Sequence, residues 1–95
     1  MTITVESMGL PNLTAVIGKK TELEFQGGTV SDLVDQLAGR FGAGDRKTLL
    51  DREGRLDPTI QVMVNEEGFL AREEFSKRAL QDGDRIRFML LVDGG

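Results

Sequence analysis

The last eleven residues, R-I-R-F-M-L-L-V-D-G-G (Arg85–Gly95), restrict the fold more than any other stretch of the sequence. Ile86 and Phe88 alternate with arginines, the period of two that is typical of a strand with one buried face. A strand this apolar is expected to lie inside a sheet, so Gly94-Gly95 should project from the fold as a thin, flexible end. Frayed glycine ends are also common, and the two glycines alone do not separate a functional end from a disordered one.

Composition excludes several function classes. The 95 residues are enough for one domain with a single core. Cysteine and histidine are both absent, which removes disulfides, a thiolate nucleophile and the commonest general base and metal ligand. The net charge of −4 argues against nucleic acid or an anionic membrane as the main partner. No apolar run approaches the roughly 20 residues that span a bilayer, and the N-terminus does not resemble a signal peptide. A cytoplasmic protein that is not an enzyme by itself is expected.

Hydrophobic periodicity predicts one main helix. Thr29 and Asp32 have capping-box spacing, and apolar residues then recur at intervals of three and four as far as Phe41. Gly42 suits the position after the last turn, whereas Gly39 would lie inside the helix at a cost of about 1 kcal/mol.

The other segments are predicted from alternation and turn residues. Strands are expected at Thr2–Ser7, Thr21–Phe25, Thr59–Asn65 and from Arg85 onward, with a short one at Phe69–Leu70. The first two strands should form an antiparallel hairpin. Between them, Met8–Lys20 is interpreted as a long loop, with strand extensions at both ends. Helical turns are predicted at Lys47–Leu50 and, weakly, over Arg72–Leu80, with Phe75 and Leu80 as anchors.

These elements predict an α+β fold with a β-grasp arrangement, in which a mixed sheet of four to five strands packs on one main helix. The N- and C-terminal strands should lie side by side at the centre of the sheet. Residues 1–92 would form the domain and residues 93–95 its tail. The predicted core is Ile3, Val5, Leu23, Phe25, Val30, Leu33, Leu37, Phe41, Leu50, Ile60, Val62, Val64, Leu80, Ile86 and Phe88.

Four motifs in this order resemble the ubiquitin-like sulfur carriers, which include the small subunit of molybdopterin synthase and the thiamin-pathway sulfur carrier. They are T-V-S-D-L-V-D-Q-L (Thr29–Leu37), V-M-V-N-E-E (Val62–Glu67), L-Q-D-G-D-R-I (Leu80–Ile86) and the terminal Gly94-Gly95. Each motif is weak by itself, because D-G-D is common turn chemistry. Together, in this order and at this spacing, they extend the likeness over most of the chain, from Thr29 to Gly95.

The resemblance implies a reaction at the chain terminus. A ubiquitin-activator-like partner would use Mg-ATP to adenylate the Gly95 carboxylate, and sulfur would then replace AMP to give a thiocarboxylate. Gly94 would keep the end slim enough to enter the partner's active site. An acceptor enzyme, such as the molybdopterin synthase large subunit, would take the sulfur. The carrier itself would bind no cofactor and no metal.

Docking requires a surface as well as a reactive end. Met89 and Leu91 should share the outward face of the last strand with Arg85 and Arg87, and Met63 should face the same way on the neighbouring strand. Exposed methionines adapt to more than one partner, as a carrier requires. The arginines could pair with acidic partner residues or simply be solvated. The predicted partner-binding residues are Phe88, Met89, Leu91, Val92, Asp93, Met63, Arg85 and Arg87.

One departure from the family pattern leaves the pathway open. The molybdopterin branch usually has a proline-bearing run and Ala before Gly-Gly, whereas this chain has Asp93 there, close to where ATP phosphates would lie. Molybdopterin or tungstopterin synthesis is the predicted pathway, with cysteine synthesis, thiamin synthesis or tRNA thiolation as alternatives. A modifier joined to lysines through Gly95, and a β-grasp interaction module with incidental glycines, are the rival functions.

Overall fold

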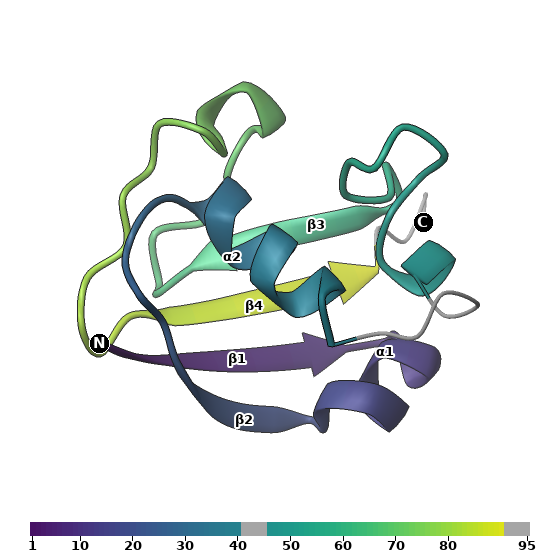
Figure 1. Ribbon diagram of the computed structural model, residues 1–95, viewed down its shortest axis with the longest axis horizontal. Helices are drawn as coiled ribbons and strands as arrows, with labels where there is room; N and C mark the ends of the chain where they lie inside the picture. The colour runs from purple at the N-terminus through teal and green to yellow at the C-terminus, as the bar shows by residue number, and fades with distance from the viewer. Residues whose placement is uncertain (41–45, 91–95) are drawn as a thin grey trace.

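The computed structural model describes residues 1–40 and 46–90. Four strands and two α-helices, with two single-turn 3-10 helices, make up the described chain (Figure 1). In chain order they are β1 (Thr2–Met8), α1 (Pro11–Ile17), β2 (Lys20–Glu24), α2 (Val30–Ala38), η1 (Arg46–Thr48), β3 (Ile60–Val64), η2 (Arg72–Glu74) and β4 (Arg85–Leu90). No helix in the described part of the chain is long and apolar enough to cross a membrane.

The sheet has the strand order β2-β1-β4-β3, so the first and last strands lie together at its centre. β1 and β4 are parallel, with Val5 beside Ile86, and the other two pairings are antiparallel. Helix α2 lies across one face of this sheet (Figure 1). This is the predicted β-grasp arrangement, and both the β1–β2 hairpin and the central pairing of the two terminal strands are confirmed.

Helix α2 begins with the predicted capping box. The Asp32 carboxylate accepts a 2.8 Å hydrogen bond from the Thr29 backbone N–H, and the Thr29 hydroxyl accepts one from the Asp32 N–H. The helix ends at Ala38 and Gly39 forms its C-cap, so the prediction that Gly39 lies inside the helix was wrong. A glycine inside a helix is about 1 kcal/mol less favourable than an alanine, so a helix that ends just before Gly39 avoids this cost. Phe41 and Gly42 lie outside the described residues.

Replacing Thr29 with alanine should lower the free energy of unfolding by about 1 kcal/mol, because the Asp32 N–H then loses its acceptor at the start of α2. Urea denaturation measures the difference, and Thr29→Ser, which keeps the hydroxyl, is the matched control. Equal losses in the two variants would contradict a capping role.

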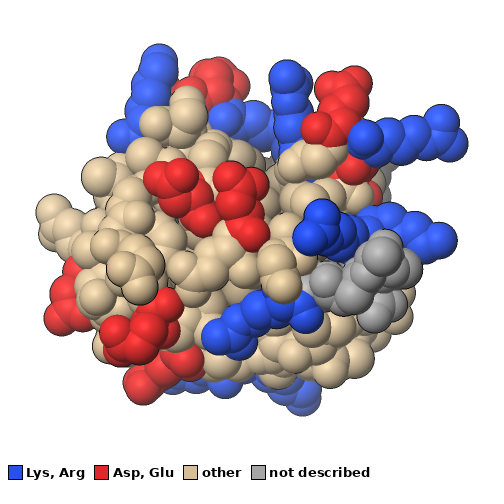
Figure 2. Space-filling view, in the orientation of Figure 1, with Lys and Arg blue, Asp and Glu red and all other residues tan. Residues whose placement is uncertain are grey.

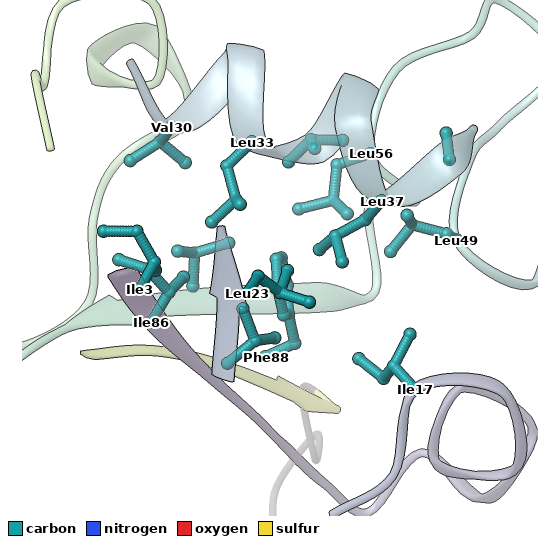
Figure 3. Packing of buried hydrophobic residues seen from close by; sticks show 14 of the residues in the cluster. Ile3, Ile17, Leu23, Val30, Leu33, Leu37, Leu49, Leu56, Ile86 and Phe88 are labelled. Atoms are coloured by element: carbon teal, nitrogen blue, oxygen red, sulfur yellow. The ribbon is translucent and has the colours of Figure 1, made fainter. Parts of the chain in front are cut away.

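The core lies between α2 and the sheet. Figure 3 shows Leu33 and Leu37 of α2 pointing toward sheet residues such as Phe88, and all three side chains are completely buried. Thirteen of the predicted core residues are buried, Phe41 is not described, and Leu50 was wrong, because its neighbour Leu49 takes the interior position. Leu50 packs against the core only in part. The buried residues outside the predicted core list are Leu13, Ile17, Val34, Ala38, Leu49, Leu56 and Phe75.

Helix α1 occupies a segment that was predicted as a loop, and that prediction was wrong. Pro11 opens the helix, where its missing N–H costs nothing. Leu13 and Ile17, one turn apart, are both buried, and Figure 3 shows Ile17 at the edge of the core. A 2.6 Å hydrogen bond between the hydroxyls of Ser7 and Thr14 ties the helix to β1. The predicted extensions of the flanking strands are present, since β1 reaches Met8 and β2 starts at Lys20.

Two smaller predictions also differ from the structure. Phe69 makes only an isolated bridge with Met63, so residues 69–70 form no strand. The weakly helical stretch after Ala71 is a single 3-10 turn, η2, although Phe75 and Leu80 are buried as predicted. The turn predicted at 47–50 is found one residue earlier, as η1.

Two of the sequence motifs contact each other beside the start of β4. Asn65, with a left-handed φ of 52°, accepts a hydrogen bond from the Arg85 N–H at 2.9 Å and donates one to the Asp84 carboxylate at 3.1 Å. The Gly83 N–H donates to the Thr2 carbonyl at 2.8 Å. The V-M-V-N and D-G-D turns therefore hold β4 between β3 and β1.

Candidate functional site

The last residue of strand β4 is Leu90, which lies at one end of the sheet and is the last residue that the structure describes. The Leu90 side chain is 42% exposed, although its position in the alternation is that of a core residue. The sites predicted at Leu91, Val92, Asp93, Gly94 and Gly95 lie outside the described residues. We call the surroundings of Leu90 the tail root, because the segment that carries these residues starts there.

A hollow of about 280 Å³ adjoins the tail root. It is formed where the start of α1 and the 3-10 helix η1 approach the end of β4. Gly9 has a φ of +70°, and a Cβ added there would lie 3.6 Å from the Leu90 Cβ, so the chain passes close to β4. The hollow is lined by Gly9, Leu10, Pro11, Asn12, Leu13, Lys47, Thr48 and Leu90.

One face of the sheet points away from α2, and we call it the outer face. Several methionines lie on it. Met63 on β3 is paired with Arg87 on β4, and Met89 is flanked by Gln61 on β3 and by Met8 on β1. The structure therefore brings the predicted residues Met63, Met89, Arg85 and Arg87 onto one surface. Both methionines are half-buried there.

The sequence did not reveal two apolar contributors to the outer face. Met8 is 48% exposed beside Met89, and Phe69 is 57% exposed beside Met63. Alternation along β1 could have shown that Met8 points outward with Glu6. Its proximity to Met89 depends on the parallel register of β1 with β4, which no local pattern indicates.

Glu6 neutralises the two arginines of the outer face. Its Oε2 lies 3.3 Å from the Arg85 Nε and 3.7 Å from an Arg87 Nη, and Arg85 also contacts Glu66. The Glu6 side chain is only 19% exposed and that of Arg87 22%, so water screens their pair less than it screens an open surface pair. The expectation of simply solvated arginines was wrong. A partner would meet a cluster of two cations and two anions.

Phe88 differs from the other predicted partner-binding residues. It is completely buried between β1 and β3, opposite Ser7 and Val62. Its side chain therefore cannot touch a partner that docks on the intact fold, and it belongs to the core.

A comparison with known families assigns the chain. The ThiS family model matches residues 12–95. The chain belongs to the ThiS family. It shares the β-grasp fold of ubiquitin-like proteins. No curated protein sequence matches it.

Solved structures of similar fold include several small proteins. SAMP1, the small archaeal modifier protein 1 of Haloferax volcanii, is 22% identical over 100% of both chains, with a TM-score of 0.70. A chain in the BexX/CysO complex of Amycolatopsis orientalis is 26% identical over 98% of this chain and 99% of that chain, with a TM-score of 0.66. The thiamine biosynthesis protein ThiS of Geobacter metallireducens is 23% identical over 100% of both chains, with a TM-score of 0.56.

Within this ThiS-family chain, one ion pair fixes the turn that follows β3. Both Nη atoms of Arg78 donate to the Glu67 carboxylate, at 2.5 and 2.8 Å. These bonds from Arg78 lower the pKa of Glu67 from its ordinary value of 4.5 to about 2. In residues 1–40 and 46–90, no three acidic side chains converge so as to hold a metal ion.

The lowered pKa of Glu67 predicts a pH dependence of stability. The charged carboxylate favours the folded state, so its contribution is complete above pH 4.5 and is lost as the pH falls toward 2. Melting temperatures of the wild type and of Glu67→Gln should therefore differ at neutral pH and converge through this window. A difference that stays constant with pH would show that the pair does not form in solution.

Proposed function

We propose that this chain carries sulfur as a thiocarboxylate on Gly95. The observation that carries the proposal is the position of β4, which runs along the centre of the sheet and ends at the exposed Leu90, five residues before Gly95. Five residues span at most about 17 Å. A partner that acts on the Gly95 carboxylate must therefore come close to the tail root and the outer face.

The chemistry is assigned to the partners, because the chain has no histidine or cysteine. An activating enzyme would join the Gly95 carboxylate to AMP from Mg-ATP and release pyrophosphate. The terminal sulfur of a persulfide would attack the acyl carbon, and AMP would leave. A second thiol would then cleave the resulting acyl disulfide, releasing the thiocarboxylate and leaving a disulfide behind. Gly94 presents no side chain to block entry into the active site.

The outer face and the tail root supply the proposed docking surface. Met8, Met63, Met89 and Leu90 offer adaptable apolar contacts, while the arginines are already neutralised by Glu6 and Glu66. Apolar contact is therefore expected to dominate affinity on this surface. An activator and a sulfur acceptor would use it in turn.

The proposed pathway is molybdopterin or tungstopterin synthesis, on the motif resemblance. Cysteine synthesis, thiamin synthesis and tRNA thiolation are the alternatives within the same chemistry. The similar structures include CysO and a thiamine biosynthesis protein. Conjugation of Gly95 to lysines is the second candidate function, favoured by the likeness to a small archaeal modifier protein.

Intact mass spectrometry tests the proposal. The chain is incubated with an enzyme that activates ThiS-family proteins, with Mg-ATP and with a persulfide donor. The mass should rise by the exchange of one oxygen for one sulfur, and the variant lacking Gly94 and Gly95 should not change. Failure of the exchange with activators from the molybdopterin, cysteine and thiamin pathways would overturn the proposal.

Peptide mapping separates the carrier from the modifier. Trypsin cuts after Arg87, the last basic residue, so a conjugated lysine would carry Phe88–Gly95 as its remnant. Such remnants on cellular proteins would support conjugation. Consumption of the thiocarboxylate by an added acceptor enzyme would identify the pathway.

A further inference from the structure

A second hollow, of about 430 Å³, lies in the helical layer of the molecule and shares no residue with the outer face or the tail root. Its walls are α2, the loop at 54–56 and the segment that starts with η2, which Figure 1 shows on the same side of the sheet. Its lining includes Val34, Asp35, Leu56, Arg72, Glu73 and Phe75.

The floor is apolar and its walls are tied together. Val34, Leu56 and Phe75 form the floor and are all at least nine-tenths buried. The Ser31 N–H donates to the Phe75 carbonyl at 3.0 Å, which joins α2 to the segment after η2. The Arg72 guanidinium donates to the Leu56 carbonyl at 2.8 Å and to two further carbonyls, which joins η2 to the opposite loop. The hollow is therefore pre-formed.

The rim carries two carboxylates without an ion-pair partner and two arginines whose guanidinium groups contact other atoms. Asp35 and Glu73 are exposed, and neither has an ion-pair partner within the described residues. Of the two arginines, Arg72 is bound to backbone carbonyls, and Arg55 lies 3.8 Å from Glu53. Figure 2 shows acidic side chains gathered over the region of α2 on this face.

We propose that this hollow binds a basic segment of a partner protein. An apolar side chain of that segment fills the floor, and a Lys or Arg beside it faces Asp35 and Glu73. The net charge of −4 also favours a basic partner.

The position of the hollow gives this site a use that goes beyond sulfur carriage. A protein bound there leaves the outer face and the tail root uncovered, because these surfaces share no residue with it. Two proteins can therefore hold the body at once, one at the hollow and one at the reactive end.

Short peptides test the site on the full chain, without any activating enzyme. The probes are a phenylalanine flanked by two lysines, the same peptide with two glutamates, and the lysine peptide with alanine in place of phenylalanine. Amide NMR shifts should change at Ser31, Asp35, Phe75 and Ser76 with the first probe. The other two should bind roughly tenfold more weakly, because each lacks either the charge or the anchor.

Matched variants complete the test. Asp35→Asn/Glu73→Gln should weaken the lysine–phenylalanine peptide roughly tenfold and remove the preference over the glutamate peptide. Glu22→Gln/Glu24→Gln removes the same charge from β2 and should leave binding unchanged. No shift at millimolar peptide, shifts centred on the outer face, or equal binding of the lysine and glutamate probes would each overturn the proposal.

Discussion

Replacing Phe88 with alanine is expected to lower the free energy of unfolding by about 3–5 kcal/mol. The side chain is completely buried on the central strand β4, between residues of β1 and β3. Its removal leaves a cavity that the flanking strands cannot close without breaking their hydrogen bonds. Small domains are stable by only about 5–15 kcal/mol, so the variant should be close to unfolding at 37 °C. Urea denaturation measures the change in midpoint.

Met89→Ala is the control for this experiment, because it truncates the next residue along β4. Met89 points to the outer face and is only half-buried, so the expected loss is less than about 1 kcal/mol. If Phe88→Ala kept the stability of the wild type and lost only partner binding, Phe88 would be a contact residue rather than a core residue.

Replacing Met89 or Met63 with aspartate is expected to raise the KM of the activating enzyme for this chain roughly 30-fold. Each substitution places a charge within the apolar part of the outer face, next to Arg87 and Met8. Loss of one central apolar contact typically costs about 2 kcal/mol or more at an interface. The kcat should stay within about twofold, because the reacting carboxylate is unchanged. Adenylation assayed by pyrophosphate release gives both constants.

Gln26→Asp is the matched control. Gln26 is exposed between β2 and α2, near the start of β1 and away from the tail root, so the same change in charge there should leave KM unchanged. If Met63→Asp and Met89→Asp behaved like this control, the partner would not dock on the outer face. A fall in kcat with constant KM would instead place these residues in the chemical step.

Periodicity along the chain was sufficient to predict the strands and helix α2. Ile60, Val62 and Val64 alternate with Gln61 and Met63, and all three are buried in β3. Thr29 and Asp32 marked the start of α2 because a capping box is a local interaction between residues three apart.

Sequence patterns failed where long-range contacts decide the structure. The seven residues of α1 lack a side-chain cap, and a helix this short is unstable alone. It forms because Leu13 and Ile17 pack in the core and the Thr14 hydroxyl forms a hydrogen bond with the Ser7 hydroxyl on β1. Likewise, nothing in the local pattern separates Leu49 from Leu50, because only the path of the folded loop turns one of them inward.

The candidate site likewise has features that the sequence predicted and features that only the tertiary structure determined. The alternation in β4 was enough to show that Arg85, Arg87 and Met89 point away from the core, because side-chain direction in a strand depends only on position. Which residues surround them depended on the parallel register of β1 with β4. That register places Glu6 between the arginines and Met8 beside Met89. Strand pairing joins residues about 80 positions apart, and its free energy comes from the whole assembled core rather than from any one segment.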